Sequence, residues 1–296
     1  MAAIHTRTLR GLAGRIGLLA AVVAGLVAGS LAAPAAAQES GPLDYVVLGD
    51  SYSSGIGASP YVSVSPLYPA QLQPCYQSSP GYADVLDAQD DVLLTANAAC
   101  AGWTAATVPL QVQVASAAGV LNAGTDLVTI TAGGNDVGFL NLLEACMFQA
   151  LKDCKAAVKG AEAVAKAQVL PALMDAYAAI RAQAPNAKIV ALGYPHLFSP
   201  EFGDNDVITA DAAEIFNKGT DTLNKVIREA AINSAGTVYV NVTDEFAGHG
   251  IGLPDSWFYF EPADVSGMNF HPNATGYAMG YAEAISNEAK IPALSD

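Results

Sequence analysis

The sequence has 296 residues, of which 28 are acidic and 13 basic, so its formal net charge at pH 7 is −15. An acidic surface of this kind excludes nucleic acid as a partner and disfavours anionic membranes. The length suffices for one substantial hydrophobic core, and no linker-like stretch divides the chain after its amino-terminal segment.

The amino-terminal segment has the order of a secretory signal peptide. A basic start containing three arginines precedes an apolar run over residues 16–32, and small residues follow up to Ala35-Ala36-Ala37. The run is marginal in length for a membrane anchor, and the Ala-x-Ala ending favours cleavage. We therefore predict that residues 1–37 are removed and that residues 38–296 form a single secreted, extracellular domain without stable membrane insertion. This mature chain would keep ten basic and 28 acidic residues, a net charge of −18.

The rest of the chain alternates short runs rich in Val, Ile and Leu with longer alanine-rich segments. The short runs predict buried strands at 44–49, 91–98, 126–132, 187–193 and 236–242. The alanine-rich segments predict helices at 104–121, 160–184, 210–234 and 273–288. This alternation predicts an α/β fold, a three-layer α/β/α sandwich around a central parallel five-stranded sheet. Functional sites in such sheets form beyond the carboxyl ends of the strands.

Three polar motifs follow predicted strands at that edge. Gly49-Asp50-Ser51 follows the first strand, where a tight turn would present the serine hydroxyl to a substrate. Ala101-Gly102-Trp103 follows the second, and the N–H of Gly102 is a candidate donor to a carbonyl oxygen. Gly133-Gly134-Asn135-Asp136 follows the third and supplies an amide donor of the kind that acyl transfer needs. The alternative interpretation is that all three are ordinary turns.

A serine nucleophile needs a base, and the predicted mature chain has three histidines. His271 is our candidate base, because it stands at the entrance to the last predicted helix, where Pro272 suits the first helical position. We assign a structural role to His196. His249, in the loop after the fifth predicted strand, is a candidate for the substrate pocket.

The four cysteines lie in the predicted mature chain, an even number for an oxidising compartment. Three pairings are possible, and the short separation of Cys146 and Cys154 favours a bond between them, which leaves Cys75 for Cys100. A zinc site is the alternative, but the cysteines lack Cys-x-x-Cys spacing and have no histidine near them. We therefore expect two structural disulfides and no metal.

The motifs around Ser51, Gly102, Asn135 and His271, in this chain order, resemble those of the SGNH hydrolases, the GDS-type esterase and lipase superfamily. The resemblance covers the whole predicted mature chain and is greatest to secreted actinomycete lipases, esterases and phospholipases. It implies a flavodoxin-like fold, with Ser51 as nucleophile and His271 as general base. It also implies an oxyanion hole formed by the N–H groups of Ser51 and Gly102 and the side chain of Asn135.

One position departs from the pattern of this superfamily. Most members have an aspartate three residues before the catalytic histidine, where this sequence has Met268. Because some actinomycete relatives use a main-chain carbonyl there, we expect the carbonyl of Met268, or a nearby main-chain oxygen, to accept the Nδ1 proton of His271. The carboxylate of Asp264 is the side-chain alternative. A carbonyl stabilises imidazolium less than a carboxylate does, but it can fix the tautomer.

These observations predict a secreted serine hydrolase that cleaves small-molecule or lipid carboxylic esters as a monomer, through an acyl-enzyme and without a cofactor. Lipase, phospholipase and carbohydrate acetylesterase activities stay open within this class. The stretch from Ile56 to Gln77, rich in Tyr, Pro and Ser, is expected to border the acyl pocket. The alternative from another class is a secreted binding protein that kept the scaffold and lost catalysis, supported only by the missing aspartate.

Overall fold

The computed structural model describes residues 41–264, 266–289 and 291. The predicted signal peptide, residues 1–37, lies outside these residues and stays a prediction. These described residues group into one compact unit. None of the helices in the described ranges combines the length and the hydropathy needed to cross a bilayer.

The core of the fold is a parallel sheet of five strands in the order β4-β1-β5-β6-β7. The strands are β1 (Leu43–Gly49), β4 (Val92–Asn97), β5 (Leu127–Thr131), β6 (Lys188–Leu192) and β7 (Thr237–Val240). Every side chain of β5 is buried, as are those of residues 45–48 in β1, because helices cover both faces of the sheet. The predicted α/β sandwich with its five strands is confirmed.

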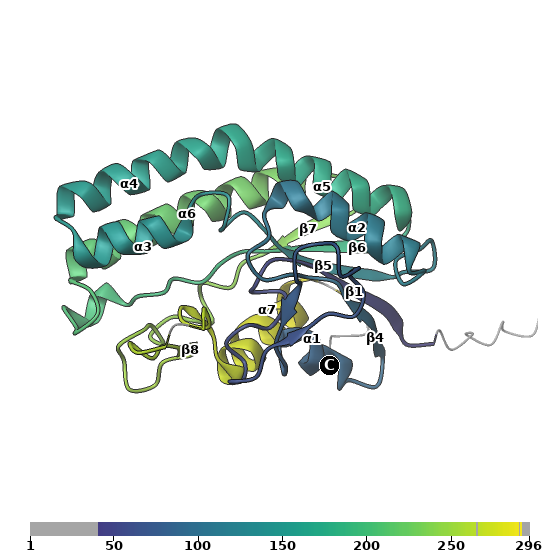
Figure 1. Cartoon of the computed structure of the whole chain (residues 1–296), viewed down its shortest axis with the longest axis horizontal. Helices are drawn as coiled ribbons and strands as arrows, with labels where there is room; N and C mark the ends of the chain where they lie inside the picture. The colour runs from purple at the N-terminus through teal and green to yellow at the C-terminus, as the bar shows by residue number, and fades with distance from the viewer. Residues whose placement is uncertain (1–40, 265, 290, 292–296) are drawn as a thin grey trace, which may run out of the picture. The chain divides into compact units, whose positions relative to one another are not determined.

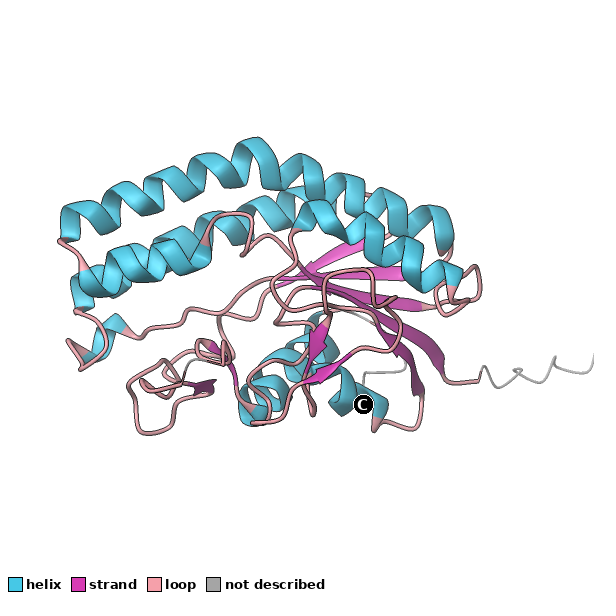
Figure 2. Cartoon of the chain, in the orientation of Figure 1, coloured by secondary structure: helices cyan, strands magenta, loops and turns pink. Residues whose placement is uncertain are grey.

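The helices form two layers, one on each face of the sheet (Figures 1 and 2). One layer contains α1 (Tyr82–Asp87), η4 (Gly276–Ala282) and α7 (Glu283–Glu288). The other contains η1 (Ala105–Thr107), α2 (Val108–Ala117), α5 (Leu170–Gln183) and α6 (Ala210–Ile232).

A helical hairpin of α3 (Phe139–Phe148) and α4 (Leu151–Val164) extends beyond the carboxyl edge of the sheet (Figure 1). The chain continues from α4 through the π-helical η2 (Ala165–Val169) directly into α5. The helix predicted at 160–184 therefore begins nine residues earlier, at Leu151, and α3 was not predicted. The sequence pattern places a helix boundary at Gly160, because glycine disfavours the interior of a helix by about 1 kcal/mol. Packing of α4 against α3 and α6 offsets that preference, so the helix continues through Gly160.

Two short antiparallel pairs and a single helical turn complete the described structure. Strand β2 (Ser63–Val64) pairs with β3 (Tyr76–Gln77), and β8 (Phe258–Tyr259) pairs with β9 (His271–Pro272). The helical turn is η3 (Pro200–Phe202). The expectation that Pro272 occupies the first helical position was wrong. Pro272 lies in β9, and the side chain of Asn273 caps the following helix by accepting the N–H of Gly276 at 3.0 Å.

Two disulfides connect segments near the carboxyl edge of the sheet. One joins Cys146 in α3 to Cys154 in α4, and the other joins Cys75 to Cys100, directly after β4. This pairing is the one that the sequence predicts. Cys100 lies two residues before Gly102, so the Cys75–Cys100 bond connects the Gly102 motif to the β2–β3 hairpin.

Candidate active site

Ser51 lies in a tight turn directly after β1, and the turn is fixed by its neighbours. Gly49 has a φ of 117°, and a Cβ at this position would overlap the carbonyl oxygen of Thr131. The side chain of Gln111 accepts the N–H of Gly49 and donates to its carbonyl, both at 2.7 Å. The N–H of Asp50 also donates to Thr131, at 2.9 Å. A residue with a side chain cannot replace Gly49 without moving Ser51.

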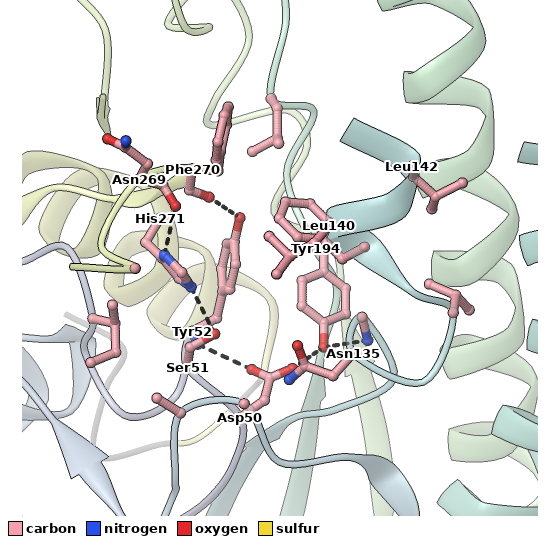
Figure 3. Close-up of a pocket in the computed structure, with 18 of the residues that line it drawn as sticks. Asp50, Ser51, Tyr52, Asn135, Leu140, Leu142, Tyr194, Asn269, Phe270 and His271 are labelled. Carbon is pink, nitrogen blue, oxygen red and sulfur yellow. Dashed lines mark hydrogen bonds between the residues drawn. The ribbon is translucent and has the colours of Figure 1, made fainter. Parts of the chain in front are cut away.

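The imidazole of His271 faces the Ser51 hydroxyl, with 2.7 Å between Nε2 and Oγ (Figure 3). Its Nδ1 lies 3.1 Å from the carbonyl oxygen of Met268 and 3.0 Å from that of Asn269. Because a carbonyl oxygen can only accept, Nδ1 carries the proton and Nε2 is free to accept from the serine. The carboxylate of Asp264 is instead occupied by Ser266, at 2.9 Å from its N–H and 2.7 Å from its hydroxyl.

The protonation state of His271 follows from its surroundings. Burial lowers the pKa of the imidazole from 6.5 to about 4, and the hydrogen bonds to the Met268 and Asn269 carbonyls oppose this shift only in part. The ring is therefore neutral at pH 7. A neutral imidazole is the form that accepts a proton from a hydroxyl group.

Phe270 gives the His271 loop its unusual backbone. It has a φ of 68°, the one positive φ among the non-glycine residues that the structure describes. Such a left-handed conformation costs a side-chain-bearing residue about 1–2 kcal/mol. The Phe270 carbonyl accepts the Tyr52 hydroxyl at 2.6 Å, and the Tyr52 ring lies 5.1 Å from the His271 ring. Tyr52 therefore holds the loop that directs two carbonyls at Nδ1.

Gly102 and Asn135 line the same cavity as Ser51 and His271. Gly102 has a φ of 78°, and no atom beyond its two chain neighbours lies within 4 Å of where its Cβ would be, so its backbone is open to a ligand. One N–H of the Asn135 amide donates to the Trp103 carbonyl at 2.8 Å, which leaves the second N–H for a ligand. The structure thus brings together the four side-chain and backbone groups that the sequence motifs predict at one site.

A buried hydrogen-bond chain connects the Ser51 turn to the loop of Asn135. The Asp50 carboxylate accepts the hydroxyl of Tyr194, the hydroxyl of Thr131 at 2.7 Å and the N–H of Tyr52 at 3.0 Å. The Tyr194 oxygen in turn accepts the N–H of Gly134 at 3.1 Å. Burial raises the pKa of Asp50 from 3.8 to about 6, although these three hydrogen bonds lower it. Only the tertiary fold joins these residues, and no sequence signal marked Tyr194.

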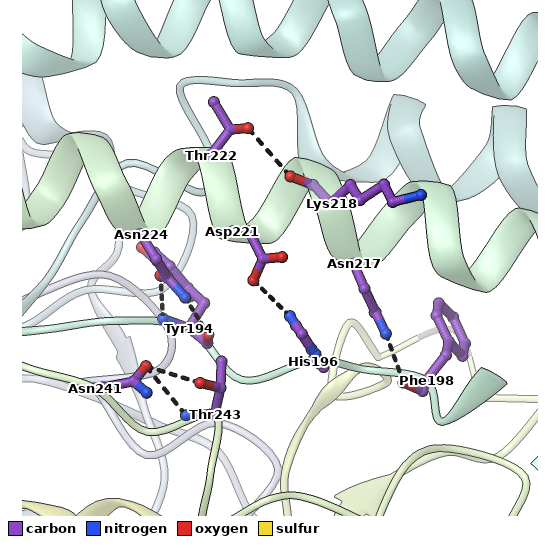
Figure 4. A network of polar contacts seen from close by, with 10 residues as sticks. All are labelled: Tyr194, His196, Phe198, Asn217, Lys218, Asp221, Thr222, Asn224, Asn241 and Thr243. Atoms are coloured by element: carbon purple, nitrogen blue, oxygen red, sulfur yellow. Dashed lines mark hydrogen bonds and ion pairs between the residues drawn. The ribbon is translucent and has the colours of Figure 1, made fainter. Parts of the chain in front are cut away.

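The other two histidines do not line the cavity. His196 contacts Asp221 of α6 at 2.8 Å (Figure 4), and the structural role assigned to it stays a prediction. His249, the candidate pocket residue, stacks instead on the Trp257 ring, with 3.8 Å between ring centroids and an interplanar angle of 11°. The prediction that His249 belongs to the substrate pocket was therefore wrong. The Trp257 indole face and the Asp255 carbonyl, 3.0 Å from Nδ1, hold its imidazole away from the cavity.

The cavity has a volume of about 810 Å³, within the range of small-molecule sites. Along α3, α4, η2 and α6 it is lined mostly by apolar side chains, among them Val137, Phe139, Leu142, Ala161, Ala165, Phe216 and Leu223. Ile56, Pro60, Val62 and Tyr76 also line the cavity, so the stretch from Ile56 to Gln77 borders it as predicted. The residues of α3 and α6 were not predicted to line a site.

Comparison with known proteins decides the family. The GDSL-like lipase/acylhydrolase family matches residues 47–279, which include the Ser51 and His271 motifs. The chain belongs to this family. The resemblance in the sequence motifs is thereby confirmed, and this GDSL-like enzyme is a hydrolase of carboxylic esters.

Lipases of Streptomyces are similar to this GDSL-like enzyme along most of its length. Lipase 1 of Streptomyces coelicolor is 30% identical over 277 residues, covering 93% of this chain and 98% of the relative. The lipase of Streptomyces rimosus is 33% identical over 245 residues, covering 82% and 86%. The crystal structures of the extracellular S. rimosus lipase and of phospholipase A1 from Streptomyces albidoflavus superpose with TM-scores of 0.70 and 0.69. Both are 31% identical and cover 82% of this chain and 98% of theirs.

Proposed function

We propose that this GDSL-like enzyme is a secreted lipase that hydrolyses long-chain carboxylic esters through an acyl-enzyme on Ser51, with His271 as general base. The observation that carries the proposal is the 2.7 Å contact between Ser51 Oγ and His271 Nε2 at one end of an apolar cavity. Two disulfides and the extracellular S. rimosus relative support export.

In the proposed reaction, Ser51 Oγ attacks the ester carbonyl while its proton passes to Nε2 of His271. The tetrahedral intermediate collapses, and the leaving alcohol takes the proton from Nε2. Water then attacks the acyl-enzyme, gives a proton to Nε2, and releases the carboxylic acid as Ser51 recovers its hydrogen. Nδ1 stays protonated throughout, oriented by the carbonyls of Met268 and Asn269 rather than by a carboxylate.

The negative charge on the carbonyl oxygen is stabilised, in this proposal, by the N–H groups of Ser51 and Gly102 and by the Asn135 amide. These donors belong to three loops at the carboxyl edge of the sheet. The contact between Asn135 and Trp103, 2.8 Å long, links two of the loops, so the donors stay in place as charge develops. Fixed donors of this kind commonly contribute about 3–4 kcal/mol each to transition-state stabilisation.

The substrate class follows from the cavity. Its lining along α3, α4 and α6 is mainly apolar, which suits an acyl chain. An acetylated polysaccharide would need polar partners for its hydroxyl groups, so we favour lipase over carbohydrate acetylesterase activity. The similarity to a phospholipase A1 makes phospholipids a second group of esters to be tested.

The proposal is tested with Ser51→Ala and p-nitrophenyl esters of increasing chain length. We expect kcat for p-nitrophenyl decanoate to fall by about 10⁶-fold, the scale of nucleophile loss in serine hydrolases. Ser63→Ala, an exposed serine in β2, serves as the matched control and should keep full activity. Turnover that survives in Ser51→Ala would refute the nucleophile. A preference for acetate over decanoate would refute the lipase while leaving the esterase intact.

A further inference from the structure

The β2–β3 hairpin presents apolar side chains to solvent beside the cavity. Val64 lies opposite Tyr76 in the antiparallel register, and their exposed fractions are 56% and 47%. Tyr61, just before β2, is 81% exposed. Val62 and Tyr76 also line the cavity that contains Ser51, so this apolar surface is continuous with the candidate substrate site.

The cavity has an apolar residue exposed on its α3 side as well. Leu140 in α3 is 72% exposed and also lines the cavity. We call Tyr61, Val62, Val64, Tyr76 and Leu140 the apolar rim. An exposed apolar surface that continues into a binding cavity marks an interaction site rather than scattered surface residues.

The charge distribution sets the chemistry of the partner. Residues 51–83, 92–125 and 137–143 contain no Asp, Glu, Lys, Arg or His, although the whole chain has 28 acidic residues. These segments contribute the apolar rim and the loop of Gly102. The charged residues among the cavity lining are carboxylates, Asp50, Glu162 and Asp264. The rim therefore lacks the cations that bind anionic lipid headgroups.

We propose that the apolar rim docks the enzyme on an electrically neutral lipid surface, from which an acyl chain enters the cavity. The proposal rests on the proposed function, because the docked lipid supplies the ester. Partly buried apolar side chains give interfacial binding in proportion to the area they bury, and tyrosine favours the headgroup level. The net charge of the chain, −15, opposes binding to anionic surfaces, so a neutral lipid surface is the partner that suits the uncharged rim.

The test measures partition onto phosphatidylcholine vesicles by co-sedimentation, in a Ser51→Ala background that prevents hydrolysis. The rim variant combines Tyr61→Ser and Val64→Thr, two residues that do not line the cavity, and threonine keeps the β preference of position 64. The control is Ile232→Ser. Ile232 is 73% exposed and ends α6 at the amino edge of the sheet, opposite the cavity.

We expect the rim variant to bind about tenfold more weakly, corresponding to about 1.4 kcal/mol, while the Ile232→Ser control is unchanged. Replacing part of the phosphatidylcholine with phosphatidylglycerol should weaken binding of the parent. The proposal would be overturned if the rim variant bound as tightly as the parent, or if the Ile232→Ser control lost as much affinity as the rim variant. Stronger binding of the parent to anionic vesicles would overturn it too. So would a parent dimer that ignores vesicles and becomes monomeric in the rim variant, because a second copy would then cover the rim.

A separate measurement distinguishes failure of docking from failure of the proposed function. With Ser51 intact, the rim variant should hydrolyse soluble p-nitrophenyl butyrate at the parent rate and an emulsified long-chain ester more slowly. An enzyme that binds vesicles but hydrolyses no ester refutes the function and leaves docking in place. An enzyme that hydrolyses the soluble ester but does not bind vesicles refutes docking alone.

Discussion

At the scale of single residues, the loop that orients His271 depends on one hydroxyl group. Phe270 holds a left-handed φ of 68°, and its carbonyl accepts the Tyr52 hydroxyl at 2.6 Å. A strained backbone of this kind persists only where its surroundings fix it. We expect Tyr52→Phe to release the loop, move the Met268 and Asn269 carbonyls away from Nδ1 and lower kcat about 10- to 100-fold. KM should change little, because phenylalanine keeps the ring that faces the cavity.

Two further variants separate positioning of His271 from general destabilisation. Tyr45→Phe removes another buried hydrogen bond, 2.6 Å to Thr129, away from the loop, and should lower thermal stability without lowering kcat. Phe270→Gly removes the conformational penalty, so adding it to Tyr52→Phe should recover part of kcat. Steady-state kinetics with p-nitrophenyl butyrate measure kcat in each variant, and thermal unfolding measures the stability of Tyr45→Phe. A kcat in Tyr52→Phe equal to that of Tyr45→Phe would contradict the positioning role.

The sequence predicts the motif residues of the site better than the residues that hold them. Ser51, Gly102 and Asn135 each follow a strand that the apolar pattern identifies, so the parallel sheet brings them to one edge. The left-handed conformation of Phe270 could not be predicted from the sequence, because this backbone conformation is usually adopted by glycine or asparagine. Tyr194 reaches Asp50 from a position 144 residues away, and only tertiary structure pairs them.

At the scale of elements, strands were easier to predict than helices. The central strands β1, β5 and β6 are short apolar runs buried on both faces, and even the part-exposed edge strands β4 and β7 keep a short apolar run that the sequence pattern identifies. The helix over α4, η2 and α5 is alanine-rich and includes Gly160, so its start could not be read from local preference. Its position matters for the site, because Ala161 and Ala165 of this helix line the cavity.

The small side chain of Ala161 in α4 leaves room in the cavity. It is 8% exposed, and Ala161→Leu would fill space that a long acyl chain occupies in the proposed function. Each CH₂ group of the substrate that loses burial forfeits about 0.8 kcal/mol, so displacing two should lower kcat/KM about tenfold. We expect that loss for p-nitrophenyl palmitate relative to butyrate.

The matched control for this prediction is Ala163→Leu, the same substitution at an exposed position two residues along α4. Its ratio of palmitate to butyrate activity should equal that of the parent enzyme. If Ala161→Leu lowers both activities equally, the substitution has disturbed the fold rather than the acyl site. An unchanged ratio would place the acyl chain elsewhere in the cavity.

At the scale of the whole molecule, the excess of acidic residues lowers the stability of the folded protein. The net charge of −15 creates repulsion that favours the more expanded unfolded chain. The pair between Lys218 and Glu214 is mostly exposed at both ends, so it contributes little against this repulsion. The buried core, which surrounds the sheet on both faces, carries the stability instead.

This repulsion predicts that NaCl stabilises the folded protein. The Debye length falls from about 10 Å at 0.1 M to about 3 Å at 1 M salt, so Tm should rise steeply at low salt and level off near about 0.5 M. Asp90 is exposed, and no hydrogen bond or ion pair of its side chain is present among the described residues. Asp90→Asn removes one negative charge and Asp90→Lys reverses it, so both should raise Tm at low salt, the lysine variant by about twice as much. These gains should shrink at 1 M NaCl, because screening already removes the repulsion. A Tm that rises linearly up to 1 M, with equal gains from both variants at every salt concentration, would attribute the effect to salt exclusion from the surface and refute the electrostatic argument.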